Sequence, residues 1–243
     1  MCGTSSFAVA APEEIQVYMD EMDAPGQYGL DLHTNTVPSG NDAGTYPGVL
    51  PSAHLFRFTP EFSYGLTPNL ELGAYVLSTD NATTGAQVDG GKVRIKFIAP
   101  KTTDQIYFWG ANFEIGKVSA QLDPNPWNAE LKGIFGLRYS GWTFAVNSNL
   151  DWVVSGPVPA PTTVEWDTKL AYAVTHVTQL GFESYNGLGV ANNLGNLNQY
   201  SQMLYGVIDT SMDKWDLNLG IGRGLNAVSD QWVLKAIIGV PID

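Results

Sequence analysis

Three histidines are the residues of this chain best suited to acid–base or metal chemistry. His33 follows Asp31 on a polar face, whereas His54 and His176 stand next to turns. A Ser–His–acid hydrolase needs a serine and a carboxylate within reach of one histidine, and no serine is an obvious partner here. No set of His, Cys and Asp residues has the spacing of metal ligands. The residues therefore predict no enzyme activity, no metal ion and no cofactor.

Neither the cysteine content nor the glycine-containing stretches of the chain indicate a functional site. Cys2 is the only cysteine, so the chain can build neither a disulfide framework nor a thiolate metal site. The stretch LNLGIGRG (217–224) reads as a strand entering a loop without a following helix, which argues against a phosphate-binding loop. The formal net charge of −12 argues against a nucleic-acid partner.

Composition limits the class of protein. The chain has 243 residues, of which 44% are hydrophobic, 12% aromatic and 15% charged. An ordinary soluble domain carries about 25% charged residues. No stretch approaches the ~20 consecutive apolar residues that a transmembrane helix requires. A helical membrane protein is thereby excluded, and the low charge content calls for another explanation.

Alternation of apolar and polar residues recurs from about residue 27 to the end, and helical periodicity is nowhere sustained. Short turns alternate with longer loops rich in Gly, Pro, Asn and Ser, which predicts an up-and-down antiparallel meander. The expected strands span 27–37, 54–64, 70–78, 91–99, 105–119, 128–139, 142–153, 164–174, 178–186, 200–209, 214–222 and 231–242.

Each expected strand has one apolar and one polar face, except 200–209, whose two faces are both mixed. The polar faces hold most of the basic residues, and the apolar faces hold no charge. We expect the polar faces to line an interior formed by Asp31, His33, Arg57, Glu61, Glu71, Arg94, Lys96, Glu114, Glu130, Lys132, Arg138, Asn147, Asn149, Asp151, Glu165, Asp167, Lys169, Glu183, Asp216 and Lys235.

Aromatic residues mark both ends of the strands. From Trp142 to Trp152, a strand rising ~3.3 Å per residue at a tilt of ~40° covers about 25 Å, the height of the lipid-facing band of a membrane barrel. Trp and Tyr favour the two bilayer interfaces. The expected lipid-interface girdle consists of Tyr28, Tyr64, Tyr107, Tyr139, Trp142, Trp152, Trp166, Tyr172, Trp215 and Trp232.

These patterns predict an all-β fold, a transmembrane up-and-down antiparallel β-barrel of about twelve strands over residues 27–243. A soluble barrel usually stops near eight strands, and in lipid the sheet must close to satisfy its backbone hydrogen bonds. The expected location is the outer membrane of a Gram-negative bacterium. A soluble β-barrel whose apolar face forms a core is the alternative.

The chain before the first strand divides into two expected parts. Ala8-Val9-Ala10 has the small-x-small form of a signal-peptidase site, so residues 1–10 are interpreted as the remnant of a truncated signal peptide, with a disordered N-terminus as the alternative. Residues 11–26 are expected either on the periplasmic side or inside the lumen. Within the lumen they would act as a plug.

Two stretches carry a family resemblance: EEIQVYMDEMDAPGQYGLDLHTN (13–35) and FTPEFSYGLTPNLELGAYV (58–76). They resemble outer-membrane β-barrel proteins of the "MetA-pathway of phenol degradation" type and, more loosely, outer-membrane transporters of fatty acids and aromatic hydrocarbons. The likeness covers most of the chain. It implies an outer-membrane channel or transporter and supplies no catalytic residues.

The expected function is a monomeric channel or transporter that passes small solutes, hydrophobic or aromatic ones included, through a charged polar lumen. Its expected partners are outer-membrane lipid, the outer-membrane assembly machinery and a solute that the sequence does not identify. One alternative is a structural or adhesion barrel whose lumen is closed by salt bridges, and another is a soluble β-barrel binding protein.

Two finer expectations concern individual side chains. Opposite charges on neighbouring strands are expected to pair, for example Arg57 with Glu71 and Lys132 with Glu114. On the strand that begins at Trp142, Val146 is expected to face lipid and Asn147 the interior. Val146→Arg should then damage assembly, and Asn147→Arg should be tolerated and alter permeation.

Overall fold

The computed structural model describes residues 13–44 and 46–242, so the proposed signal-peptide remnant lies outside the described residues. The described chain is almost entirely strands and turns, with one short 3₁₀ helix, η1 (Leu197–Gln199). Among these residues, no helix is long and apolar enough to cross a membrane. The strands are β1 (Tyr28–Ser39), β2 (Phe56–Thr67), β3 (Leu70–Asp80), β4 (Gln87–Ile98), β5 (Tyr107–Val118), β6 (Trp127–Tyr139), β7 (Trp142–Ser155), β8 (Thr163–Ala173), β9 (Thr178–Val190), β10 (Asn193–Leu194), β11 (Gln202–Met212), β12 (Trp215–Gly224) and β13 (Trp232–Val240).

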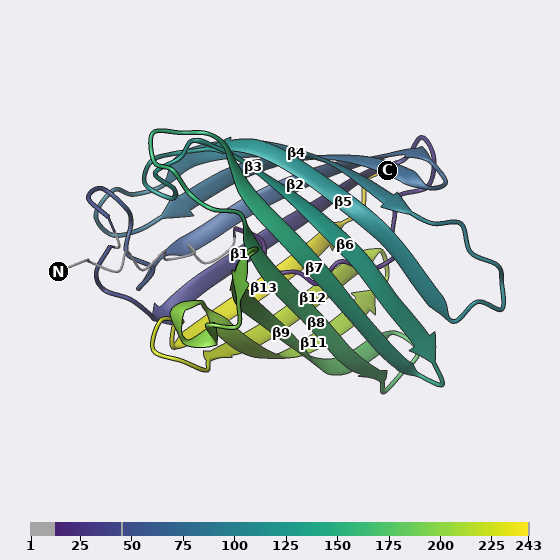
Figure 1. Cartoon of the computed structure of the whole chain (residues 1–243). Helices are drawn as coiled ribbons and strands as arrows, with labels where there is room; N and C mark the ends of the chain where they lie inside the picture. Colours follow the sequence, from purple (N-terminus) through teal and green to yellow (C-terminus); the bar gives the residue numbers. More distant parts are fainter. Residues whose placement is uncertain (1–12, 45, 243) are drawn as a thin grey trace.

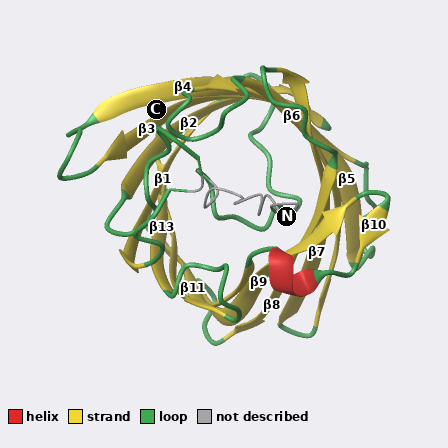
Figure 2. Cartoon of the chain, turned by 60° about the vertical axis from the view of Figure 1, so that its left-hand side comes forward, coloured by secondary structure: helices red, strands yellow, loops and turns green. Residues whose placement is uncertain are grey.

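The strands close into a ring (Figures 1 and 2). Neighbouring strands pair antiparallel in chain order, β9 pairs with both β8 and β11, and β1 pairs with β13 through contacts such as Leu32 with Ile238. The two-residue β10 folds back and pairs antiparallel with the end of β9 only. The prediction of a closed antiparallel barrel of twelve strands is therefore confirmed, and closure satisfies the backbone hydrogen bonds as lipid demands.

Several strands run past the boundaries expected from composition. The hairpin of β3 and β4 stays paired as far as Thr79 and Gln87, and β9 continues to Val190, so the loops at this end are shorter than expected. Gly, Asn and Thr are poor indicators of a strand. Pairing with a neighbour keeps such residues extended beyond the apolar band.

Burial separates the two faces of most strands. On β7, Asn147 and Asn149 are buried, whereas Trp142 is 49% exposed and Leu150 37% exposed. The exterior of the barrel is a belt of exposed Leu, Val, Ile, Phe, Trp and Tyr side chains, a surface far larger than the apolar patches that soluble proteins tolerate. Lipid must cover this belt. The chain is accordingly an outer-membrane barrel, and the soluble alternative lacks the polar exterior that it requires.

The strand that could not be phased from sequence is β11. Met203, Tyr205 and Val207 are buried inside the barrel, whereas Leu204 and Ile208 are exposed on the outside. Both faces of β11 are thus apolar at its centre. Alternation cannot assign such a strand, because it depends on a difference in polarity between the two faces.

Candidate functional site

The lumen of the barrel is the candidate site, because alternate residues of the strands bring charged and amide side chains together there. The structure places all the predicted lumen residues as follows. Buried are His33, Arg57, Glu61, Glu71, Arg94, Lys96, Glu114, Lys132, Asn147, Asn149, Asp167, Lys169, Glu183 and Lys235. Partly buried are Asp31, Glu130, Arg138, Asp151 and Glu165, and exposed is Asp216, which lies one residue after β12 begins and accepts a hydrogen bond from Ser211 (2.5 Å).

One ion cluster joins β2, β3 and β4. The Arg94 guanidinium donates through Nε to Glu61 (2.6 Å) and through Nη2 to Glu71 (2.7 Å), and all three side chains are buried. A buried charge is tolerated only when it is paired and hydrogen-bonded. Arg94 therefore neutralises two carboxylates of the inner wall at once.

The two salt bridges expected from sequence are wrong. Arg57 lies opposite Thr79, whereas Glu71 lies opposite Gly65 near the other end of the same hairpin, so the two side chains cannot meet. Lys132 pairs with Glu130 on its own strand (3.2 Å) rather than with Glu114. The antiparallel register decides these neighbours, and an alternation pattern does not contain the register.

A second ion cluster lies across the lumen on β8, β9, β11 and β13. Lys169 pairs with Glu183 (3.1 Å) and Asp209 (2.9 Å), and Lys235 also pairs with Glu183. The Tyr185 hydroxyl donates to Glu183 at 2.7 Å. Glu183 thus anchors two lysines, which rigidifies this side of the barrel.

Residues 13–26, called the lumenal segment below, run inside the ring of strands (Figure 2). The backbone of Tyr18 exchanges two hydrogen bonds with the Asn147 side chain: its N–H donates to Oδ1 (2.6 Å), and its carbonyl accepts from Nδ2 (2.9 Å). Asn147 has no exposed surface. This contact argues against the expectation that Asn147→Arg is tolerated, because an arginine at this position would displace the lumenal segment.

The lumenal segment also has an apolar side. Ile15 and Val17 are buried in one hydrophobic cluster with Phe108 and Ile134 of the wall and with Tyr205 of β11. The apolar inner face of β11, which the sequence could not assign, is thus part of the surface against which this segment packs.

The Tyr18 ring lies among three cations of the wall. Lys132 Nζ is 4.6 Å, Lys96 Nζ 5.3 Å and the Arg94 guanidinium 5.8 Å from the ring centroid. The Tyr18 hydroxyl shares a 2.7 Å hydrogen bond with the Tyr75 hydroxyl. Cation–π attraction within about 6 Å stabilises such an arrangement. The segment therefore partly neutralises repulsion among these cations.

Charged contacts hold the segment at the short-turn end of the barrel. Asp20 pairs with both Lys101 and Arg138, and Glu21 pairs with Arg138 (2.6 Å). Burial raises the pKa of Asp20, but hydrogen bonds from Lys101 and Arg138 outweigh it, so the pKa lies below its usual range. Asp20 thus stays ionised and joins the segment to the rim.

The predicted girdle residues lie on the outer surface. Ring contacts join neighbours within it: Tyr28 to Tyr64 and Trp142 to Tyr172, each with ring centroids 4.9 Å apart. Such rings suit the interfacial region because they are apolar with one polar group. Exposed are Tyr28, Tyr107, Tyr139, Trp142, Trp166, Tyr172, Trp215 and Trp232, and partly exposed are Tyr64 and Trp152.

The sequence reasoning missed several polar residues of the lumen, among them Lys92, Asp209 and Tyr75. Lys92 pairs with Glu13 of the lumenal segment (3.2 Å), Asp209 pairs with Lys169, and Tyr75 bonds Tyr18. Lys92 shares the parity of Arg94 and lies just inside the expected strand, so extending the polar face by one step would have found it. Asp209 lies on the unphased strand, and tyrosine on a polar face carries no clear signal.

The sequence matches no protein-family profile and no curated protein. Solved structures resemble the fold. The COG4313 outer membrane channel from Pseudomonas putida F1 aligns with a TM-score of 0.61 and 12% identity, over 92% of this chain and 99% of its own. The KdgM porin in complex with disordered oligogalacturonate aligns at 0.60 and 8%, over 88% and 99%. The NanC porin aligns at 0.59 and 12%, over 88% and 99%. Identities this low establish the shared outer-membrane barrel fold alone.

Proposed function

We propose that this chain is a gated outer-membrane channel for small solutes, in which the lumenal segment is the gate. The observation that carries the proposal is the contrast between the two parts of the lumen. The wall is a closed sheet, whereas residues 13–26 make side-chain contacts with it and form no strand. Polar contacts of this kind can be exchanged for contacts with water, so the segment can move while the barrel stays intact.

The lumen suits solutes that combine polar and apolar parts. Charged clusters around Arg94 and Glu183 lie in the same interior as the apolar inner face of β11, where Ile15 and Val17 now pack. Displacement of the segment would uncover both surfaces to a solute. Small aromatic acids combine polar and apolar parts in this way. We also propose that the chain is of the "MetA-pathway of phenol degradation" type, a resemblance that rests on residues 13–35 and 58–76.

A barrel that is closed permanently and serves a structural or adhesion role is the second candidate. The observation in its favour is the density of ion pairs inside, where Arg94 and Glu183 each hold two partners. Such a barrel conducts no ions whatever the state of residues 13–26. Conductance therefore separates the two functions.

The experiment is planar-bilayer recording of the purified full-length protein. The channel proposal predicts discrete conductance steps, and their frequency should rise in Arg138→Gln, which loses the contacts to Asp20 and Glu21. Lys117→Gln is the control, because Lys117 lies on β5 at the opposite end of the barrel. Silence of both variants, with heat-modifiable gel mobility showing folded barrels, would favour the structural role. Swelling of liposomes in benzoate and in an uncharged sugar would then test the solute class.

A further inference from the structure

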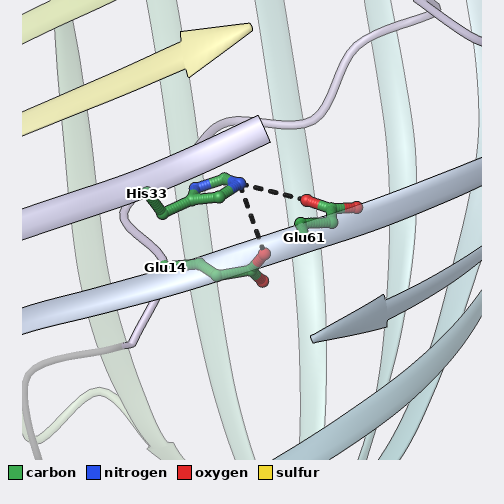
Figure 3. Close-up of side chains that lie close together, drawn as sticks. All are labelled: Glu14, His33 and Glu61. Carbon is green, nitrogen blue, oxygen red and sulfur yellow. Dashed lines mark hydrogen bonds and ion pairs between the residues drawn. The ribbon is translucent and has the colours of Figure 1, made fainter. Parts of the chain in front are cut away.

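Glu14, His33 and Glu61 bring three metal-ligand atoms together inside the barrel (Figure 3). His33 lies in the middle of β1 and Glu61 in the middle of β2, one diagonal step apart in the strand register. Glu14 comes from the lumenal segment. Spacing in the sequence did not reveal this group, because one ligand comes from outside the sheet.

The distances fit a small dication. His33 Nε2 is 3.0 Å from Glu61 Oε2 and 3.7 Å from Glu14 Oε1, and all three atoms lie within 4.8 Å of one another. Ligands of a tetrahedral zinc ion, at about 2.0–2.2 Å from the metal, are about 3.3–3.5 Å apart. The two distances from His33 bracket this value, and the separation of the two carboxylate oxygens lies within 4.8 Å, so side-chain shifts on the order of an ångström would complete three bonds.

The surroundings leave the three ligand atoms available. Arg94 takes Oε1 of Glu61 (2.6 Å), which leaves Oε2 directed to His33. Glu14 Oε1 is buried and has no hydrogen-bond partner among the described residues. His33 is 2% and Glu61 3% exposed, and the Glu14 side chain is 14% exposed, with its Oε1 atom buried. A buried oxygen without a partner is costly, and a metal ion would satisfy it.

We propose that Glu14, His33 and Glu61 form a binding site for a first-row transition-metal dication of the zinc type, which ties the lumenal segment to the barrel wall. One imidazole nitrogen with two carboxylates suits Zn²⁺, whereas Ca²⁺ and Mg²⁺ prefer oxygen ligands only. Glu14, Glu61 and Glu71 together carry three negative charges against the single positive charge of Arg94, which leaves two to balance a dication. Water would supply the remaining ligand of a four-coordinate ion.

The test is titration of the full-length protein in detergent with Zn²⁺, and with Co²⁺ as an optical probe. We expect one equivalent of Co²⁺ to give visible absorption bands of a nitrogen–oxygen site and Zn²⁺ to abolish them. His33→Ala should weaken binding tenfold or more, and His54→Ala, a matched histidine before β2, should leave it unchanged. Absence of saturable binding, equal effects of both variants, or equal competition by Ca²⁺ would overturn the site.

A second pair of variants protects against misfolding. Glu14→Gln changes only the lumenal segment, and Glu13→Gln, whose partner is Lys92, is its matched control. Heat-modifiable mobility verifies the barrel in each. Only Glu14→Gln should weaken metal binding, and unchanged binding in this folded variant would remove Glu14 from the site.

A conductance measurement tests whether the metal ion holds the lumenal segment, and it rests on the proposed channel function. Zn²⁺ should lengthen the closed intervals of the wild type and leave those of Glu14→Gln unchanged. Metal binding without any effect on conductance would overturn the tie between segment and wall, whereas a silent protein that still binds one metal ion would contradict the channel and leave the metal site standing.

Discussion

Asn147→Ala should release the lumenal segment from the wall. The substitution removes both hydrogen bonds between the Asn147 side chain and the backbone of Tyr18. A buried hydrogen bond contributes about 0.5–1.5 kcal/mol net, so two contribute about 1–3 kcal/mol. At about 1.4 kcal/mol per factor of ten, the population of the displaced segment rises about 5- to 150-fold.

The matched control is Asn149→Ala. Asn149 is a buried asparagine on the same face of β7, but its Nδ2 donates to Asp167 of the wall (2.7 Å). Single-channel recording in planar bilayers measures the frequency and duration of opening for both variants. Heat-modifiable mobility and intrinsic tryptophan fluorescence show whether each barrel is folded.

Two results would refute this reasoning. If folded Asn147→Ala and Asn149→Ala open equally often, the Tyr18 contact does not hold a gate. If Asn147→Ala alone unfolds the barrel, the lumenal segment is part of the structural core and cannot move independently. Only an increase confined to Asn147→Ala supports the gate.

Three further changes have defined outcomes. Val146→Arg, facing lipid halfway along β7, should lower the free energy of unfolding by about 2–4 kcal/mol in urea titrations of the protein in vesicles, whereas Val154→Arg near the strand end should cost about 1 kcal/mol or less. Arg94→Ala removes the cation shared by two buried carboxylates, so that Glu61 keeps only His33 and Glu71 keeps only the Asp23 N–H. It should cost about 3–5 kcal/mol in the same assay, more than Lys96→Ala. The pKa of Asp20 is lower in the folded protein than its unfolded value of about 3.9. The stabilisation from ionised Asp20 is therefore complete above the unfolded pKa and is lost as the pH falls through the folded pKa. Channel opening should increase below about pH 4 in the wild type and not in Asp20→Asn.

A specific result would contradict each of these three predictions. Equal losses at Val146 and Val154 would mean that the outer face of β7 does not span a bilayer. An Arg94→Ala barrel as stable as the wild type would show that water reaches and solvates the two carboxylates. A rise in acid-induced opening that persists in Asp20→Asn would assign the pH response to another carboxyl group.

The barrel itself could be predicted because its determinants are local. Alternation separates the buried from the exposed residues along most strands, as at Asn149 and Leu150, and the turn lengths predicted an up-and-down order. The inner and outer faces of β11 could not be assigned from the sequence, because both faces are apolar from Met203 to Ile208. Where the lipid-facing and lumen-facing residues are both apolar, the pattern that encodes orientation disappears.

The ion pairs and the lumenal segment could not be predicted with the same success. The sequence predicted that Glu71 pairs with Arg57, but the strand register places Glu71 beside Arg94. The contact of Asn147 with Tyr18 joins residues 129 positions apart. Such contacts depend on how twelve strands are aligned and on which residues enter the lumen. The sequence of a single strand encodes neither of these features.

The sequence by itself determined that this chain closes into a membrane barrel with a charged interior, because hydrophobic alternation and interfacial aromatics are properties of each strand and of its lipid surroundings. Only the tertiary structure decided which charges meet and what fills the lumen. Strand register aligned Arg94 with its two carboxylates, and the course of residues 13–26 brought Glu14 to His33. These choices are cooperative, since each contact exists only when the whole ring has closed around the segment.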